Sequence, residues 1–252
     1  MIDANAAKRA LTAPEVADLD LSMFDRRDTV NFVLQRSEVL WDVRRAGQVV
    51  KQWSAGDPTR MDAVVDARGP ELIRRAAAFI FAEFQELRPT LDRIAPRRAA
   101  DIGCGYGFFS LFLARAYDAE VTLIDIEENE HRHFGYAEDG AAYTSLSRAW
   151  QMLVGNGVAD GAVTTRNPRD EGTAGLGPFD LITSFVSCGY HYPAAVYADF
   201  IRERLNPEGA AILDIRRRAA REQAPVLATI GEATRLGETS RGTAYRTLIR
   251  RT

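Results

Sequence analysis

Asp101-Ile-Gly-Cys-Gly-Tyr-Gly107 is the stretch that decides the fold of this chain. Its three glycines stand at alternate positions, where missing side chains allow a sharp backbone turn and let a ligand lie against bare peptide groups. The next residues, Phe108-Phe-Ser-Leu-Phe-Leu-Ala-Arg-Ala-Tyr117, carry apolar side chains at helical spacing. We therefore expect the turn to open a helix whose free N–H groups face the ligand.

A second strand follows this helix. Val121-Thr-Leu-Ile-Asp125 is rich in β-branched residues and ends in a carboxylate. Asp125 is thus placed to accept hydrogen bonds from the hydroxyls of a ribose. Together, the strand, glycine turn, helix and acidic strand end predict a site for a nucleotide-containing cofactor.

Two families use this arrangement, and the glycine spacing separates them. A dinucleotide fingerprint needs its third glycine one position later, where this chain has Phe108, and it does not require Asp101. An acidic residue two positions before Gly103, followed by Gly105 and Gly107, resembles motif I of the class I S-adenosylmethionine-dependent methyltransferases. Asp125 then matches the acidic end of that family's second strand.

The resemblance continues through the second half of the chain. Gly177-Pro-Phe-Asp-Leu-Ile-Thr-Ser184 resembles the family's fourth strand, with Asp180 opening it and Ser184 at its carboxyl end. Leu205-Asn-Pro-Glu-Gly209 resembles the turn before the fifth strand, although Glu208 replaces the commoner glycine.

The expected fold class is α/β. From Arg97 onward strand and helix signals alternate, which predicts a doubly wound, mostly parallel sheet. The resemblance implies seven strands in a Rossmann-like methyltransferase fold, the last two forming an antiparallel hairpin at Ala233–Glu238 and Ala244–Arg250. We expect residues 1–95 to form an N-terminal helical extension and residues 96–252 to form the S-adenosylmethionine-binding domain.

The N-terminal extension shows helical periodicity and few strand signals. Helices are expected over Thr29–Trp41 and Glu71–Phe84, with Pro89 and Pro96 marking the exit of the second. In the resembling family such helices cap the cofactor or shape the substrate pocket. The alternative is that they only cover an edge of the sheet.

Composition limits the function. With 252 residues and 46% hydrophobic content, the chain can bury one sizeable core and an appendage. A formal net charge of −3 offers no global basic field for nucleic acid. Cys104 and Cys188 match no disulfide or metal spacing, and no apolar run approaches the roughly 20 residues needed to cross a bilayer. Because the N-terminus lacks a secretory signal, a cytoplasmic location is expected.

The resemblance also implies the contacts to S-adenosylmethionine. Gly103, Cys104 and Gly105 would lend backbone groups to its methionine part, with Gly107 completing the turn. Asp101 would orient the amino group, Asp125 would hold the ribose, and Ile126 would lie against adenine. Asn167 is the candidate for the adenine amino group, with Asp170 competing. The implied cofactor-binding set is Asp101, Gly103, Cys104, Gly105, Gly107, Asp125, Ile126, Asn167 and Ser184.

All three histidines fall on loops expected at the carboxyl ends of strands. His131 and His133 lie in the long polar segment Glu127–Asp139, which either hangs over the ligand or is a solvated surface loop. His191 follows the fourth strand. The three could bind a metal in principle, but no further ligand at suitable spacing completes a set, and we expect none.

Methyl transfer to a hydroxyl requires alignment of the acceptor and removal of a proton. An ordinary histidine pKa of about 6.5 suits a general base at neutral pH, so His191 is the candidate catalytic residue; the alternative is a purely structural role for its ring. Ser184-Phe-Val-Ser187 lacks the Asp/Asn-Pro-Pro-aromatic motif of many amino-methylating enzymes. The expected acceptor is therefore a small molecule with a hydroxyl, such as a sugar or a natural-product intermediate.

Two other functions stay open from the residues alone. One is a non-catalytic relative that binds the cofactor and serves as a partner subunit, and the other is a nicotinamide-dependent oxidoreductase. For partners we expect a small-molecule substrate, no nucleic acid and no membrane, with a homodimer as an assembly to test.

Overall fold

The computed structural model describes residues 2–127, 144–239 and 242–251. The chain divides into two compact units, Ile2–Glu86 and Leu87–Thr252. The division falls inside one long helix, α5 (Thr59–Ile94). Each unit is described separately.

The first unit is helical. Asp25 begins α3 with a capping box, in which its side chain accepts from the Asp28 N–H and Asp28 accepts from the Asp25 N–H. Helix α5 is kinked at Gly69, immediately before Pro70, as expected where a proline interrupts helical hydrogen bonding. The elements of this unit before α5 are α1 (Ala4–Ala10), α2 (Pro14–Ala17), α3 (Arg26–Gln35), the 3-10 helix η1 (Ser37–Leu40) and α4 (Ala46–Ser54).

A buried arginine organises the helical unit. The Arg75 guanidinium, 3% exposed, donates to the Asp42 carboxylate at 2.7 and 2.9 Å and to the Val39 carbonyl at 2.9 Å. It also forms an ion pair with Glu71 and lies 4.4 Å from the ring centroid of Trp41. Hydrogen bonds from Arg75 hold the pKa of Asp42 well below its usual range. The charge is buried at tolerable cost because these partners occupy the donors of the guanidinium.

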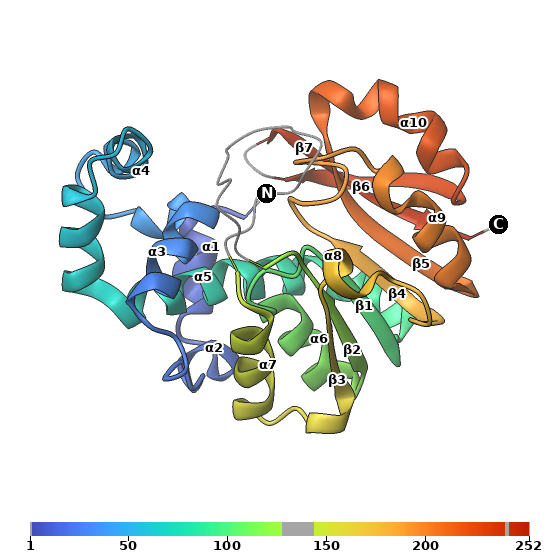
Figure 1. The fold of residues 1–252 in the computed structure, drawn as a ribbon, viewed down its shortest axis with the longest axis horizontal. Coiled ribbons are helices and arrows are strands. Elements are labelled where there is room, and N and C mark those ends of the chain that lie inside the picture. The colour runs from blue at the N-terminus through green and yellow to red at the C-terminus, as the bar shows by residue number, and fades with distance from the viewer. Residues whose placement is uncertain (1, 128–143, 240–241, 252) are drawn as a thin grey trace. The chain divides into compact units, whose positions relative to one another are not determined.

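The second unit is built on a seven-stranded sheet of order β3-β2-β1-β4-β5-β7-β6 among the residues described (Figure 1). Strands β1 to β5 pair in parallel, whereas β7 is antiparallel to both β5 and β6. The expected doubly wound, mostly parallel seven-stranded sheet is confirmed. The strands are β1 (Arg98–Ile102), β2 (Glu120–Ile124), β3 (Val163–Arg166), β4 (Phe179–Ser184), β5 (Leu205–Arg216), β6 (Glu232–Thr239) and β7 (Ala244–Arg250).

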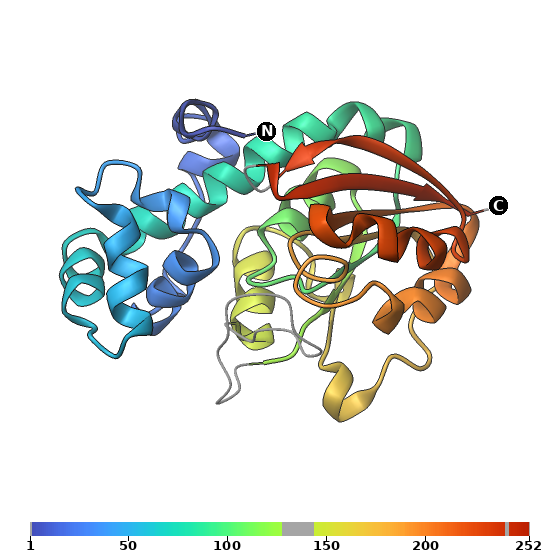
Figure 2. The same ribbon diagram turned by 90° about the horizontal axis from the view of Figure 1, so that it is seen from above.

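Helices cover both faces of the sheet (Figures 1 and 2). Because side chains alternate along a strand, Ile102, Ile124 and Ile182 join one apolar cluster with α9 and α10. Their neighbours Asp101 and Thr183 point to the other face, where α6 lies. The helices are α6 (Phe108–Tyr117), α7 (Leu146–Gly155), α8 (Pro168–Glu171), α9 (Ala195–Arg204) and α10 (Ala220–Ala228), with 3-10 helices η2 (Asp160–Ala162) and η3 (Arg217–Ala219). Within the described residues, no helix is both long and apolar enough to span a bilayer.

Pro89 does not end the helix that precedes the sheet, contrary to the expectation from sequence. Helix α5 continues to Ile94, and the buried side chains of Leu87 and Leu91 flank the proline. Their burial offsets the one helical hydrogen bond that proline cannot donate. The helix ends where Ala95 adopts a left-handed φ of 46°, donates its N–H to the Leu91 carbonyl and is followed by Pro96.

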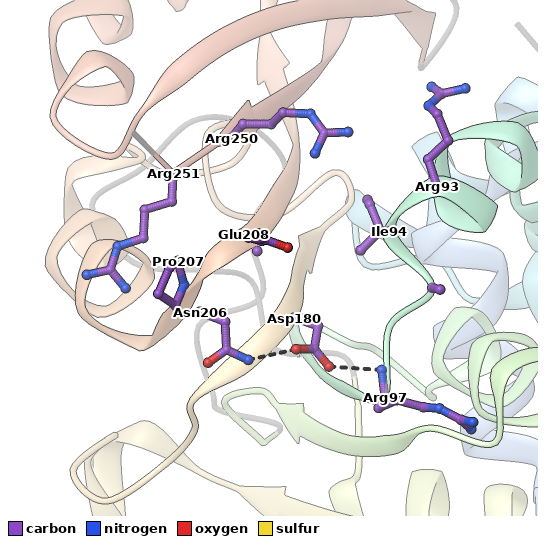
Figure 3. A pocket seen from close by; sticks show the side chains of 11 residues that line it. Arg93, Ile94, Arg97, Asp180, Asn206, Pro207, Glu208, Arg250 and Arg251 are labelled. Atoms are coloured by element: carbon purple, nitrogen blue, oxygen red, sulfur yellow. Dashed lines mark hydrogen bonds between the residues drawn. The ribbon is translucent and has the colours of Figure 1, made fainter.

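A single carboxylate ties together the amino ends of three strands. Asp180, at the start of β4, accepts hydrogen bonds from the backbone N–H of Arg97 and of Arg98, both at 2.9 Å. Its other oxygen accepts from the Asn206 side chain at 2.6 Å. Arg97, Asp180 and Asn206 line a cavity of about 560 Å³ at this edge of the sheet, and Arg93 and Arg250 are among its other lining residues (Figure 3). Burial raises the pKa of Asp180, but the three hydrogen bonds outweigh it, and the pKa lies below its ordinary value.

We predict that Asp180→Ala destabilises the protein by about 1–3 kcal/mol, because it removes the charged acceptor of three hydrogen bonds, from the N–H groups of Arg97 and Arg98 and from the Asn206 side chain. The midpoint of urea unfolding measures this. Since the folded pKa is lowered, the stabilisation is present at neutral pH and is lost as the pH falls through that folded pKa. The gap between wild type and variant should therefore narrow in acid. Glu203→Ala, on the exposed side of α9, is the control and should be as stable as wild type. An Asp180→Ala variant as stable as wild type would contradict the stabilising role of Asp180.

Candidate active site

The glycine turn lies between the carboxyl ends of β1 and β2. Gly103, Gly105 and Gly107 have φ values of +71°, +58° and +77°, which residues with side chains rarely adopt. The N–H groups of Gly103 and Cys104 both donate to the Ile124 carbonyl, at 2.7 and 3.3 Å. These two bonds attach the turn to the end of the second strand. Gly107 then begins α6.

Ser187 packs directly on the bare backbone of Gly103. A Cβ added at Gly103 would lie 1.9 Å from the Ser187 Oγ, a separation that no two such atoms tolerate. Ser187 belongs to the loop that follows β4, so this contact brings the ends of β1 and β4 together. Glycine is therefore required at position 103 by both its φ and its neighbour.

Asp125, directly after β2, is hydrogen-bonded to the glycine turn. Its Oδ2 accepts the N–H of Gly105 at 2.8 Å, and its carboxylate is 9% exposed. Burial raises the pKa of Asp125 to about 7, with smaller contributions from the charges of Asp101 and Glu127. A carboxylate offers about four acceptor positions, so acceptor capacity remains for further donors such as ribose hydroxyls.

Asp101 lies beneath the turn and is bound within the protein. Its Oδ2 accepts from the Ser110 hydroxyl and its Oδ1 from the Thr183 hydroxyl, both at 2.9 Å. The residue thus joins β1 to β4 and to the first turn of α6. Burial raises its pKa to about 6 against the opposing effect of these two hydroxyls.

Two further residues anchor the segment that follows Asp125. The Thr144 hydroxyl donates to the Gly105 carbonyl at 2.7 Å, and the Glu127 carboxylate accepts from the Leu146 N–H at 3.1 Å. Residues 128–143, with His131 and His133, lie outside the described part of the structure. Thr144 was not identified from sequence, because a lone threonine after a polar segment carries no distinguishing signal.

The hydrogen bonds of Ser184 join parts of the protein backbone to one another. Its side chain is fully buried, donates to the Ile102 carbonyl at 2.7 Å and accepts from the Cys188 N–H at 2.9 Å. It therefore ties the loop after β4 to the end of β1. Two residues later, Val186 adopts a φ of +52°, a conformation that costs a β-branched residue about 1–3 kcal/mol and that occurs mainly at functional sites.

His191 lies in this same loop. Its backbone N–H donates to the Ser187 carbonyl at 2.8 Å, and its half-buried ring meets Tyr190 edge-on at 5.0 Å between centroids. The neighbouring Tyr192 hydroxyl lies 3.1 Å from the Ser187 Oγ. Burial raises the pKa of Tyr192 well above its ordinary value, and the charge of Asp125 adds to the effect. Tyr192 is thus hydrogen-bonded to the residue that packs on Gly103.

Asn167 and Asp170 form one polar cluster after β3. The Asn167 side chain accepts from the Arg169 N–H at 3.1 Å and donates to Asp170 at 2.6 Å. The two candidates that the sequence left open for the adenine contact are therefore hydrogen-bonded to each other. Ile126 lies half-buried directly after Asp125.

The two cysteines, Cys104 and Cys188, are neutral thiols in this structure. Burial raises the pKa of the Cys104 thiol well above its ordinary value, so it stays neutral, and its hydrogen-bonding partner is the Gly105 carbonyl. Burial likewise raises the pKa of Cys188 to about 12. In the portion of the chain that the structure covers, no three His, Cys, Asp or Glu side chains form a cluster that could hold a metal ion.

The sequence profile of the methyltransferase domain matches residues 72–248. The chain therefore belongs to the methyltransferase domain family and is a methyltransferase. Membership implies S-adenosylmethionine as the methyl donor, and the remaining acceptor capacity of Asp125 beside the glycine turn fits its ribose. The dinucleotide oxidoreductase is thereby set aside.

Solved structures with similar folds act on different acceptors. The O-methyltransferase TomG of Streptomyces achromogenes, involved in tomaymycin synthesis and bound to SAM, is 18% identical, with a TM-score of 0.48 over 68% of this chain and 79% of its own. A ribosomal protein L11 methylase from Lactobacillus delbrueckii is 19% identical, with a TM-score of 0.46 over 67% and 78%. A 16S rRNA methyltransferase from T. thermophilus, bound to AdoMet and guanosine, is 17% identical, with a TM-score of 0.48 over 70% and 43%. Among curated proteins, none matches significantly.

We predict that stability rises as the pH falls from about 8 to 5, because the folded pKa values of Asp125 and Asp101, about 7 and about 6, lie above the unfolded value near 3.8. In that range the native state binds more protons than the unfolded state. Each proton retained contributes a slope of at most about 1.4 kcal/mol per pH unit. Asp125→Asn, which keeps an acceptor for Gly105, should flatten the curve measured by urea unfolding. Parallel curves for variant and wild type would contradict this assignment.

Proposed function

We propose that this methyltransferase transfers the methyl group of S-adenosylmethionine to a hydroxyl of a small molecule, such as a sugar or a natural-product intermediate. The observation that supports the proposal most is the loop from Phe185 to Ala194. It carries His191 and Tyr192 at the edge where the glycine turn and Asp125 meet, and Ser187 packs on Gly103. In this proposal the loop supplies a base and hydroxyl groups beside the residues that bind the cofactor.

In this proposal one set of residues contacts S-adenosylmethionine and a second set holds the first in place. Asp125 accepts the ribose hydroxyls, Ile126 packs against adenine, and Asn167, in its cluster with Asp170, meets the adenine amino group. The peptide groups of Gly103, Cys104 and Gly105 contact the methionine part, with Gly107 shaping the turn. Asp101 and Ser184 belong to the second set. Asp101 binds the hydroxyls of Ser110 and Thr183, and Ser184 binds the backbone of Ile102 and Cys188.

S-adenosylmethionine supplies a methyl group that its sulfonium already activates. The protein therefore has to orient the acceptor, exclude water and remove one proton. His191 accepts that proton from the acceptor hydroxyl. The loop keeps its shape during this step because the Gln223 side chain donates to the Gly189 carbonyl and accepts from the Ala194 N–H, at 2.9 and 2.8 Å.

We predict that Asp125→Ala weakens S-adenosylmethionine binding at pH 8 by about 10- to 100-fold, because hydrogen bonds to a charged group contribute about 1.5–3 kcal/mol each. Isothermal titration calorimetry measures this. Asp199→Ala, on the exposed surface of α9, is the matched control and should bind as wild type does. If wild type fails to bind the cofactor, the proposed site is wrong.

His191→Ala should lower kcat by about 100-fold or more while leaving cofactor affinity unchanged, because the base acts only on the acceptor. The backbone bond from residue 191 to the Ser187 carbonyl persists in the variant, so the loop is expected to keep its form. The assay is release of S-adenosylhomocysteine with a panel of hydroxylated acceptors. Unchanged turnover removes His191 from the role of base. A wild type that binds the cofactor but turns over no acceptor in a broad panel favours the non-catalytic partner.

A further inference from the structure

A buried ion pair lies behind the loop that carries His191. Asp214 on β5 is fully buried and Arg246 on β7 is 5% exposed; the two residues are direct partners in the antiparallel register. The guanidinium donates to both carboxylate oxygens, at 2.8 and 2.9 Å. Burying two charges costs several kcal/mol each, so such a pair is weak evidence for a role in stability alone.

The pair is connected to the loop through an aromatic ring. The Arg246 guanidinium carbon lies 4.3 Å from the ring centroid of Phe185, the first residue after β4. Phe185 in turn meets Phe109 edge-on, with 4.6 Å between centroids. Phe109 lies in the first turn of α6, beside Ser110, which binds Asp101. A continuous path of contacts thus runs from the antiparallel edge of the sheet to the glycine turn.

Phe185 also leads into the strained part of the loop. Val186 follows with its φ of +52°, and Ser187 then lies against Gly103. A strained conformation persists only where the surrounding structure holds it. The Phe185 ring, held between Arg246 and Phe109, belongs to the residue directly before Val186.

We propose that Asp214 and Arg246 are positioning residues for methyl transfer. By stacking on Phe185, Arg246 holds the turn at Val186 and Ser187 in place over Gly103, and Asp214 fixes the plane of the guanidinium. The pair thereby sets the space available above the glycine turn. The inference rests on the proposed function only in assigning that space to the cofactor and acceptor.

The double variant Asp214→Leu/Arg246→Met tests this pair. Apolar residues of similar size often replace a buried pair at no cost in stability, so the variant should fold even if Arg246→Met alone does not. Amide exchange followed by NMR reports on the N–H groups of Tyr190 and His191, which both donate to the Ser187 carbonyl. We expect their exchange to accelerate about 10-fold or more relative to amides of β1, and S-adenosylmethionine affinity to fall about 10-fold.

Phe185→Leu supplies the second arm, because it removes the ring and leaves the ion pair intact. If Arg246 acts through Phe185, the effects of Phe185→Leu and Arg246→Met on exchange and on affinity should be non-additive. Arg235→Met is the matched control. Arg235 also stacks on a ring, 3.6 Å from the centroid of Tyr245, and pairs with Glu238, but it lies on the exposed strand β6.

The outcomes separate the two proposals. Wild-type exchange and wild-type cofactor affinity in the Asp214→Leu/Arg246→Met variant would overturn the positioning role, as would additive effects or an equal response of Arg235→Met. Exchange is measured without any ligand. Faster exchange at Tyr190 and His191 in a protein that binds no S-adenosylmethionine would therefore support the positioning pair while the proposed function fails.

Discussion

The contact of Ser187 with the bare backbone of Gly103 is the constraint on which the site depends. It is possible only because Gly103 lacks a Cβ, and it joins the loop after β4 to the turn after β1. The same turn is bound to the end of β2 through the Ile124 carbonyl. Strands β1, β2 and β4, which are separate along the chain, thus present their carboxyl ends at one place.

Buried carboxylates support the junction in two different ways. Within the described part of the structure, Asp101 and Asp125 are bound by hydroxyl and N–H groups and pair with no cation, and burial raises the pKa of both. Asp214 instead has the full charge of Arg246 against it. The first arrangement leaves acceptor capacity for a ligand at a cost in stability. The second sets a full opposite charge against the carboxylate and leaves the guanidinium face for Phe185, so it suits a supporting role better than ligand binding.

The fold could be predicted from sequence because its signals are local. The alternate glycines, the β-branched runs and the carboxylates Asp101 and Asp125 each lie within short stretches of sequence. They predict a mostly parallel α/β sheet, to which the resemblance adds seven strands, and that sheet is observed. The failure at Pro89 has a tertiary cause, since the burial of Leu87 and Leu91 outweighs a local breaking signal. The contacts of Ser110, Thr183 and Thr144 join residues far apart in the sequence, and single hydroxyl residues carry no periodicity. Likewise, no residue near Arg75 in the sequence indicates that its side chain is buried against Asp42.

The two halves of the sheet contribute different parts of the site. Strands β1 to β3 carry the glycine turn, Asp125 and Asn167, all of which were readable as motif positions. Ser187 and His191 follow β4, and Arg246 lies on β7; of these three, only His191 was singled out from the sequence. The contact of Arg246 with the Phe185 ring and the edge-on contact of Phe185 with Phe109 connect these halves on the α6 face of the sheet. In the proposed positioning role, a change in β7 can therefore alter the geometry above Gly103 without touching the glycine turn or Asp125.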